Sequence, residues 1–340
     1  MKKVLLSVLL VITMAFTMLA CGKTDTPASG SEGETIQLRV ANVTQVDHPM
    51  NKAVEFFIEK IKEESDGRIE ITNYPARQLG DDRELFEQVQ QGSLDMALIS
   101  AGPVGSTTEL AAALQLPFMF EDWDQWMDVM TNEVTTDLLS EFDTLSVKAL
   151  TVYDSGFRHF VAVDKPITST DDLKGLKFRV AETPLHIGIF EALGASPTPL
   201  AYGEIYTSLQ NKVIDGLEMD LPAISMEKHY EVAKNVTLSR HFTWPAIFMM
   251  NLDKWNSLSA EDQQLFNDCA MAVMSENVAY IQEQEEAAMK VLEDNDVTVT
   301  ELTEEQKQAM VEATKAVTEE YTAKNPKIAA FAEYANSLKK

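Results

Sequence analysis

Two arginines stand at the edges of two short apolar segments near the middle of the chain. Arg158 precedes the segment from His159 to Val163, and Arg179 lies inside the segment from Leu176 to Ala181. Both segments have the composition of β-strands bounded by turn residues. A guanidinium among packed neighbours is costly unless an anion meets it, and its planar fork fits a carboxylate. Arg179 is therefore predicted to pair with a carboxylate, either of a bound ligand or of an acidic side chain of the protein.

The chain is acidic throughout. It has 340 residues, with 54 Asp and Glu against 28 Lys and Arg and a formal net charge of −26. This length is sufficient for two lobes with a core each. The missing basic patch argues against nucleic-acid binding. A solvated acidic surface is the usual reason for such a charge, and a ligand site inside the protein can have the opposite sign.

Residues 1–20 have the pattern of a secretory signal peptide. Two lysines precede a mostly apolar run from Val4 to Leu19, which is short for a membrane-spanning helix, and Ala20 and Cys21 follow. The sequence MLAC resembles the lipobox of bacterial lipoproteins, in which the cysteine becomes the lipidated first residue. The alternative is an ordinary secretory signal with a chance cysteine. Residues 21–34 are otherwise small and polar, which predicts a flexible tether between a lipid and the folded body.

The remaining reactive residue types do not form a catalytic pattern. Cys269 is the only cysteine after Cys21, so we predict a small buried hydrophobe rather than a disulfide or a nucleophile. The five histidines have no helical metal spacing, and the chain lacks a Gly-x-Ser-x-Gly elbow, a His-Glu-x-x-His motif and a Gly-rich phosphate loop. We therefore predict no metal, no cofactor and no enzyme. An exported α/β enzyme is the alternative, although no pair of acids is singled out for glycosidase chemistry.

The first part of the body alternates between predicted strands and helices. The expected strands are residues 36–43, 68–74 and 94–100, and the expected helices are residues 49–65 and 81–91. This β-α-β-α-β order predicts a parallel sheet covered by helices. Ligands on such sheets bind beyond the carboxyl ends of the strands. The residues that this rule brings near a cleft are Asn42, Gln45, His48, Gln78, Ser100 and Ala101.

The rest of the chain continues in the same α/β style. The predicted strand 147–153 leads through turn residues Asp154 to Gly156 into the segment after Arg158. Residues 245–251 form a strand that can return to the first sheet. Further predicted helices are residues 123–142, 170–174, 184–193, 203–210, one long helix over 259–293, and two closing helices over 303–324 and 326–340.

The order and spacing of several short motifs resemble the solute-binding proteins of tripartite ATP-independent periplasmic (TRAP) transporters, the DctP-type family. The resemblance covers essentially all of the body after residue 34. It implies two α/β lobes joined by crossing hinge strands, with a long helix spanning both. Lobe I is expected to comprise residues 35–155 plus 244–283, and lobe II residues 156–243 plus 284–340. The motifs are Gly67–Ile71, Gln78–Gly80, Gly92–Asp95, Leu116–Phe118, Gly175–Val180, Gly194–Pro199, Glu204–Gln210 and Asp215–Glu218.

The resemblance gives Arg179 a role. In this family, the arginine of the motif that matches Gly175–Val180 forms a two-pronged salt bridge to the ligand carboxylate. Arg158 matches a second arginine that binds the same carboxylate or another oxygen. Its alternative role is a helper salt bridge to Asp154 or Glu182. The other expected contacts are Glu182 as a hydroxyl acceptor, Asn42 at the end of the first strand, and His48, Tyr202, Trp244 and Ser100.

Several of these positions have a structural alternative. His48 is also suited to a helix cap, Tyr202 to a structural aromatic, and Trp244 to filling the hinge, while Ser100 is in reach by topology only. The chain departs from the family where many members carry Asn-Pro and this one has Met219 and Asp220. Met219 cannot replace the hydrogen bonds of that asparagine. This side of the pocket is therefore expected to be more apolar or served by another group.

The predicted function is that of an exported binding protein, lipid-anchored to the outer face of the cytoplasmic membrane or periplasmic. It captures a small organic acid by hinge closure and delivers it, as a monomer, to TRAP membrane subunits. The alternatives are the exported enzyme and a ligand-sensing accessory protein of the same fold. Two arginines with polar neighbours and the aromatic ring of Tyr202 suggest a sugar acid as the ligand. The alternative ligand is a C4-dicarboxylate, whose second carboxylate would lie near His48 or Trp244.

Overall fold

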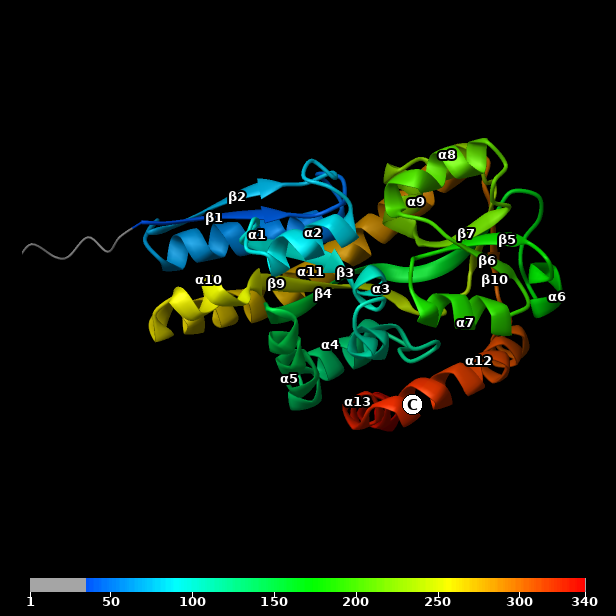
Figure 1. Ribbon diagram of the computed structural model, residues 1–340. Coiled ribbons are helices and arrows are strands. Elements are labelled where there is room, and N and C mark those ends of the chain that lie inside the picture. Colours follow the sequence, from blue (N-terminus) through cyan, green and yellow to red (C-terminus); the bar gives the residue numbers. More distant parts are fainter. Residues whose placement is uncertain (1–34, 340) are drawn as a thin grey trace, which may run out of the picture. The chain divides into compact units, whose positions relative to one another are not determined.

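The first lobe is built on three parallel strands. The structure is a computed structural model that describes residues 35–339, so the predicted signal peptide, Cys21 and tether lie outside the described residues. The strand order β2-β1-β3 confirms the parallel sheet predicted from the strand–helix alternation. Helices α1 and α2 make the two crossovers (Figure 1). The bounds are β1 (Ile36–Ala41), α1 (Pro49–Glu64), β2 (Ile69–Tyr74), α2 (Asp82–Gln90), β3 (Met96–Ser100) and a short α3 (Ala101–Val104).

Helix α1 shows how local sequence sets these elements. His48 is its N-cap residue, and the Nδ1 atom of His48 accepts a hydrogen bond from the amide of Met50 at 3.3 Å. Val54, Phe57 and Ile61 recur at helical spacing and are fully buried against the sheet. The helix therefore begins at a satisfied cap and is held by one apolar face.

Two long strands, β4 (Val147–Ala162) and β9 (Thr243–Asn251), run from the first lobe into the second. Strand β9 is antiparallel to β3, which confirms the predicted return to the first sheet. The predicted turn at Asp154–Gly156 is wrong, because β4 is one continuous strand with a bulge between Asp154 and Phe157. Gly156, at a φ of +144°, adopts a backbone conformation that other residues rarely reach. Residues before the bulge pair with β9, and residues after it pair with β7 and β8.

The second lobe holds the remaining strands. Parallel strands β7, β5 and β6 are neighbours in that order, and β8 and β10 form a parallel pair beside the end of β4. Strand β10 was not predicted; it has only four residues and no alternation of buried and exposed side chains. The bounds are α6 (Thr170–Leu173), β5 (Lys177–Val180), α7 (Pro184–Ala192), β6 (Ser196–Pro199), α8 (Ile205–Gln210), β7 (Gly216–Asp220), α9 (Leu221–Met226), β8 (Asn235–Leu238) and β10 (Thr298–Glu301).

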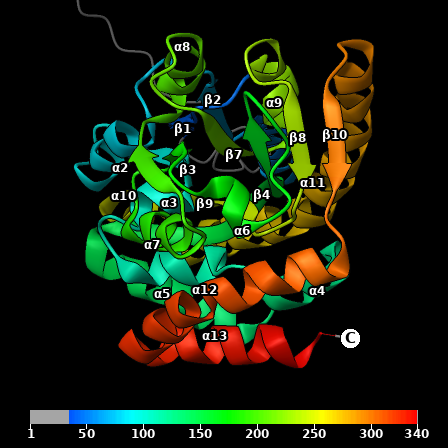
Figure 2. The same ribbon diagram turned by 90° about the vertical axis from the view of Figure 1, so that its right-hand side faces the viewer.

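One predicted helix is divided. Residues 123–142 were expected to be continuous, but they form α4 (Trp123–Met130) and α5 (Glu133–Ser140), followed by a 3₁₀ segment, Glu141–Leu145. The break comes at Asn132, whose side chain accepts a hydrogen bond from the amide of Val134 at 3.1 Å and so caps α5. The closing helix α12 (Glu304–Lys324) packs on α7 and on α13 (Pro326–Ser337), and α13 lies beside α4 and α5 (Figure 2).

Helix α11 (Ala260–Asp294) spans both lobes and confirms the predicted long helix. It packs on α1 and β4 in the first lobe and on α9 in the second. Its buried Asn277 meets the β4 bulge, since Oδ1 accepts from the amide of Asp154 at 2.9 Å and Nδ2 donates to the carbonyl of Asp154 at 3.2 Å. Nδ2 also lies 3.3 Å from the carbonyl of Pro49. One amide side chain thus joins α11, the bulge and the start of α1.

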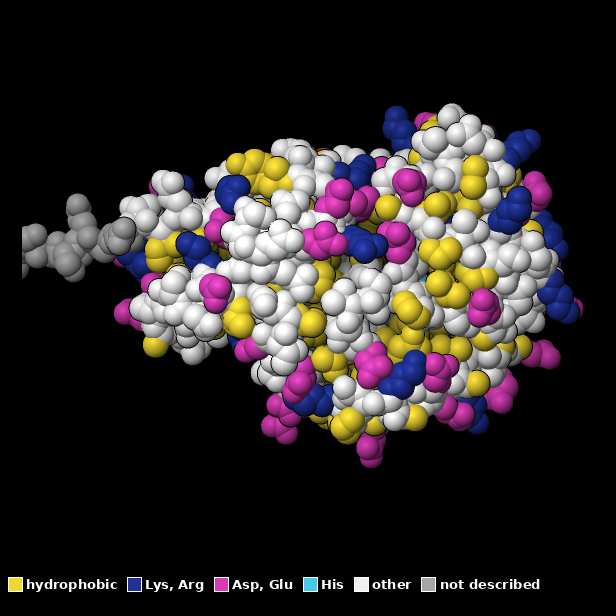
Figure 3. All heavy atoms as spheres, in the orientation of Figure 1, with side chains coloured by type: hydrophobic (Ala, Val, Ile, Leu, Met, Phe, Trp, Pro, Cys, Tyr) yellow, Lys and Arg dark blue, Asp and Glu magenta, His cyan; other side chains and the backbone are white. Residues whose placement is uncertain are grey.

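The surface of the protein reflects its acidic composition. Acidic side chains are spread over the face shown in Figure 3, with basic ones between them. Among residues 35–339, no helix is both long and apolar enough to span a membrane.

Cys269 is a buried free thiol, as predicted, and burial raises its pKa to about 11. It packs as an apolar side chain and is mostly protonated at neutral pH.

Replacing Asn277 with alanine should destabilise the fold. The change removes three hydrogen bonds to the buried peptide groups of Asp154 and Pro49, and we expect a loss of about 2–4 kcal/mol in the free energy of unfolding. Urea denaturation measures this loss. Glu283→Ala, on the exposed face of the same helix, is the matched control and should change stability by less than about 0.5 kcal/mol. Equal midpoints for the two variants would contradict the joining role of Asn277.

Candidate ligand-binding site

A cavity lies between the two lobes. Its lining comes from the start of α2, the end of β3 and α3 in the first lobe, and from β4, β5, the start of α7 and the Leu200–Tyr202 segment in the second. Trp244 of β9 adds a wall. Arg158 and Arg179 are 3% and 4% exposed, so a ligand reaches them only when the lobes separate.

Arg158 and Arg179 form a buried pair around one carboxylate. The Nε of Arg158 donates to Oε2 of Glu218, and its Nη2 donates to the Glu218 carbonyl at 2.8 Å. The Nη1 of Arg179 lies 3.6 Å from Oε1 of the same glutamate. Arg179 also donates twice to the carbonyl of Leu200, at 3.1 and 2.8 Å. Hydrogen bonds to residues 35–339 use two of the five N–H groups of each guanidinium, so donors remain for an anion.

The helper salt bridge predicted for Arg158 has different partners. Asp154 and Glu182 were expected, but the partners are Glu218 and Asp220, whose Oδ2 lies 3.8 Å from Nη1 of Arg158. The cause is the register of β4 and β7, which pairs Arg158 with Asp220 and puts Glu218 two residues along the same face.

Burial shapes the charges of this cluster. Burial lowers the pKa of Arg179 to about 10, and Glu218 opposes the change, so the guanidinium stays charged at neutral pH. Burial raises the pKa of Asp220 to about 6, and Arg158 opposes it. The Oδ1 atom of Asp220 accepts a hydrogen bond from Ser155 Oγ at 3.0 Å.

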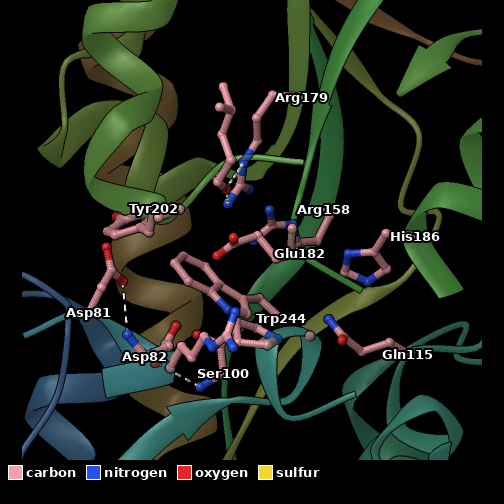
Figure 4. Close-up of a pocket in the computed structure, with 16 residues that line it drawn as sticks. Asp81, Asp82, Ser100, Gln115, Arg158, Arg179, Glu182, His186, Tyr202 and Trp244 are labelled. Atoms are coloured by element: carbon pink, nitrogen blue, oxygen red, sulfur yellow. Dashed lines mark hydrogen bonds between the residues drawn. The ribbon is translucent and has the colours of Figure 1, made fainter. Parts of the chain in front are cut away.

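Carboxyl groups line the part of the cavity near α2. Asp82 is the first residue of α2, and its Oδ1 accepts from the amide of Ser100 at 3.1 Å. Burial and the neighbouring Asp81 raise the pKa of Asp82 to about 7. Glu182 follows β5 and enters the cavity between the arginines and Trp244, whereas Asp81 and Asp82 lie on the first-lobe side (Figure 4).

Two aromatic rings complete the walls. The rings of Tyr202 and Trp244 have centroids 5.0 Å apart, and the guanidinium of Arg158 stacks 4.7 Å above the ring of Trp244. The hydroxyl of buried Tyr202 has no hydrogen-bond partner within the part of the chain that the structure describes. Tyr202 therefore brings an unpaired polar atom to the lining of the cavity.

The structure brings six of the nine predicted binding residues to this cavity: Arg158, Arg179, Glu182, Tyr202, Trp244 and Ser100. The other three do not line it. Asn42 is buried against Asn51 and Thr44 at the end of β1. His48 caps α1, and its Nε2 lies 3.1 Å from Ser155 Oγ. Met219 is on the face of β7 that pairs with His159, away from the arginines. Asp220, not Met219, faces Arg158.

Sequence reasoning missed several residues of the lining, notably Asp82, Gln115 and His186. Two of the three stand close to a motif that the family resemblance used. Asp82 follows Gln78–Gly80, and Gln115 precedes Leu116–Phe118. That proximity was the available signal. Among residues 35–339, no group of three or more His, Cys, Asp or Glu side chains is arranged to hold a metal ion.

Two α/β lobes that share crossing strands and enclose a cavity with a buried arginine pair define a solute-binding protein. Residues 40–325 match the family DctP, described as bacterial extracellular solute-binding protein, family 7, and the chain belongs to this family of TRAP solute-binding proteins.

Solved structures and a curated relative support the assignment. The chain is 31% identical to a TRAP solute-binding protein from Bradyrhizobium sp. BTAi1 in complex with α/β-D-galacturonate, with a TM-score of 0.84 over 88% of this chain and 99% of that one. A protein from Chromohalobacter salexigens with bound D-glucuronate is 29% identical, with a TM-score of 0.83 over 89% and 100% of the two chains. The ectoine-binding periplasmic protein TeaA of Halomonas elongata is 32% identical over 269 residues, 77% of each chain.

The charge balance of the cluster can be tested with Glu218→Gln. The variant leaves two buried guanidinium groups without their shared anion, and we expect a loss of about 3–5 kcal/mol in the free energy of unfolding. Urea denaturation of Glu218→Gln and of the exposed control Glu70→Gln gives the comparison. Wild-type stability in Glu218→Gln would mean that the two arginines do not depend on this carboxylate.

Proposed function

We propose that the protein captures a sugar acid with one carboxylate and several hydroxyl groups and delivers it to the membrane subunits of a TRAP transporter. The observation that carries this proposal is the division of the cavity into an arginine pair and a group of carboxyl side chains. The remaining N–H groups of Arg158 and Arg179 supply donors for a ligand carboxylate.

The carboxyl side chains favour hydroxyls over a second carboxylate. Asp81, Asp82 and Glu182 accept hydrogen bonds from hydroxyl groups, and Asp82, with a pKa of about 7, also donates in its protonated form. A second ligand carboxylate beside these groups would be desolvated next to like charge. We therefore prefer a sugar acid to a C4-dicarboxylate. The relatives with bound galacturonate and glucuronate support this choice, and ectoine shares with them a single carboxylate.

Capture proceeds by closure of the lobes. Three contacts join segments of the first lobe to segments of the second. Arg77 Nη1 and Gln45 Nε2 donate to Oε1 of Glu227 at 3.2 and 3.1 Å, and the amide of Gly203 donates to Asp81 at 3.4 Å. The hinge lies where β4 and β9 cross between the lobes. Closure removes water from the arginine pair, and charge-assisted hydrogen bonds are stronger in the drier site.

No chemical step is part of this function. The homologues are binding proteins of transporters, and the site needs only to hold its ligand until the closed protein meets the membrane subunits. We propose the same role for this chain rather than that of the exported enzyme.

Thermal shift with a panel of acids tests the ligand class. D-Galacturonate, D-glucuronate or D-galactonate should raise the melting temperature, because a ligand that binds only the folded state stabilises it by mass action. Succinate and malate should raise it much less. The opposite order would replace the sugar acid by a dicarboxylate.

Arg179→Ala should lower the affinity for the stabilising acid by at least about 100-fold, since a buried ligand carboxylate would lose its charged partner. Arg179→Lys should also bind weakly because an ammonium lacks the planar fork. Isothermal titration calorimetry provides the affinities. Arg39→Ala, an exposed arginine on β1, is the control and should bind as the wild type does. Unchanged affinity in Arg179→Ala would remove the anchor from the proposal.

We further propose that Cys21 carries a lipid that keeps the protein at the outer face of the cytoplasmic membrane. In cells that express Cys21→Ser, the protein should move from the membrane fraction to the soluble exported fraction, and labelling with radioactive palmitate should disappear. The control is Cys269→Ser, which should stay in the membrane fraction with its label. Retention of label in Cys21→Ser would contradict lipidation at this cysteine.

A further inference from the structure

One buried side chain of the cavity has no structural explanation in the fold. His186 of α7 is 1% exposed, and neither of its ring nitrogens has a hydrogen-bond partner among residues 35–339. Its ring stacks on Phe242, with centroids 4.8 Å apart and an angle of 16° between the planes. A buried donor or acceptor without a partner costs about 1–3 kcal/mol. Stacking needs an aromatic ring but no nitrogen, so packing alone does not account for a histidine here.

The space beside this ring is kept open by a glycine. A Cβ on Gly102 would stand 3.1 Å from Cβ of Ala181 and 3.4 Å from Cε1 of His186. The same Cβ would lie 3.5 Å from Oε1 of Gln115. All four residues line the cavity, and Figure 4 shows His186 and Gln115 on the same side of it. Two small residues therefore leave room between an imidazole and an amide.

The imidazole in this space is neutral. Burial lowers the pKa of His186 well below its usual range, and the charges of Arg158 and Arg179 lower it further. A neutral ring presents one N–H donor and one acceptor nitrogen, and the Gln115 amide adds two donors and a carbonyl. Hydroxyl groups, which both donate and accept, match this set. Among the described residues the cavity has one further cation in its lining, Arg83 of α2, and this arginine pairs with Glu87 at 3.4 Å.

We propose that His186 and Gln115, with the space over Gly102, form a hydroxyl-recognition subsite that determines which sugar acid the protein accepts. The inference rests on the proposed function, because the acid must first be held by Arg179. A site that is built to bond a hydroxyl discriminates against an analogue without it, since the buried polar atoms of the protein then stay unpaired.

A thermodynamic cycle between protein and ligand tests the subsite. Calorimetry gives the affinities of wild type and His186→Phe for D-galacturonate and for each of its monodeoxy analogues. Phenylalanine keeps the stacking on Phe242 and removes both nitrogens. In the wild type, at least one missing hydroxyl should cost about 10- to 100-fold in affinity, and in His186→Phe that penalty should fall below about 3-fold. The same penalties in both proteins would overturn the subsite and leave His186 a packing residue.

Gly102→Ala probes the same space without changing a polar group. The added methyl should weaken D-galacturonate binding by about 10-fold or more, since it enters the gap between Ala181 and His186. Gly188→Ala on α7 is the matched control, because its Cβ would meet only Val317 at an ordinary 3.9 Å and binding should be unchanged. Equal affinities in the two alanine variants would contradict the subsite even if His186→Phe does not fold.

The two proposals fail differently. If wild-type protein binds none of D-galacturonate, D-glucuronate and D-galactonate, the proposed function is wrong and the subsite fails with it. If the wild type binds a sugar acid but the hydroxyl penalties do not depend on His186, only the subsite is wrong.

Discussion

The structure depends on the burial of two guanidinium groups around one carboxylate. Arg158 and Arg179 are almost completely covered, and Glu218 meets both from β7. Charges in such a place are stable only with close partners, so β4, β5 and β7 must keep their register. The crossing strands, the bulge and the capped helix α11 all hold that register. The same strands therefore connect the two lobes and hold the arginine pair in place.

The two buried arginines stand out in a protein with a formal net charge of −26. Glu218 and Asp220 lie against them, so their charge is largely balanced within the protein. What the two guanidinium groups offer an anion is the N–H groups that these acids leave unused. In the proposed function, the carboxyl groups near α2 and the neutral imidazole of His186 meet the uncharged oxygens of the ligand. That proposal assigns affinity to the arginines and selectivity to groups that carry no positive charge.

The sequence predicted the parallel sheet, the long helix and a buried Arg179 near a carboxylate, because hydrophobic spacing and residue type are local signals. It did not predict the partner of Arg158, since Glu218 is 60 positions away and reaches it through strand register. His48 was predicted equally well as a cap and as a contact, and only the packing of α1 decides between them. His186 was missed because an isolated histidine in an apolar helix resembles a core residue; its unpaired nitrogens appear only in three dimensions.

The bulge in β4 decides which side chain of this strand faces the cavity. Three steps along β4, from Asp154 to Phe157, match two along β9, from Pro245 to Thr243, so the bulge contains one extra residue. Partners in a ladder share a face, and Asp154 and Phe157 therefore lie on the same face although an odd number of steps separates them. In a regular strand of the same sequence the alternation would be shifted by one residue after this point, and His159 would face the cavity in place of Arg158. A single extra residue thus determines that an arginine, and not a histidine, stands at this position.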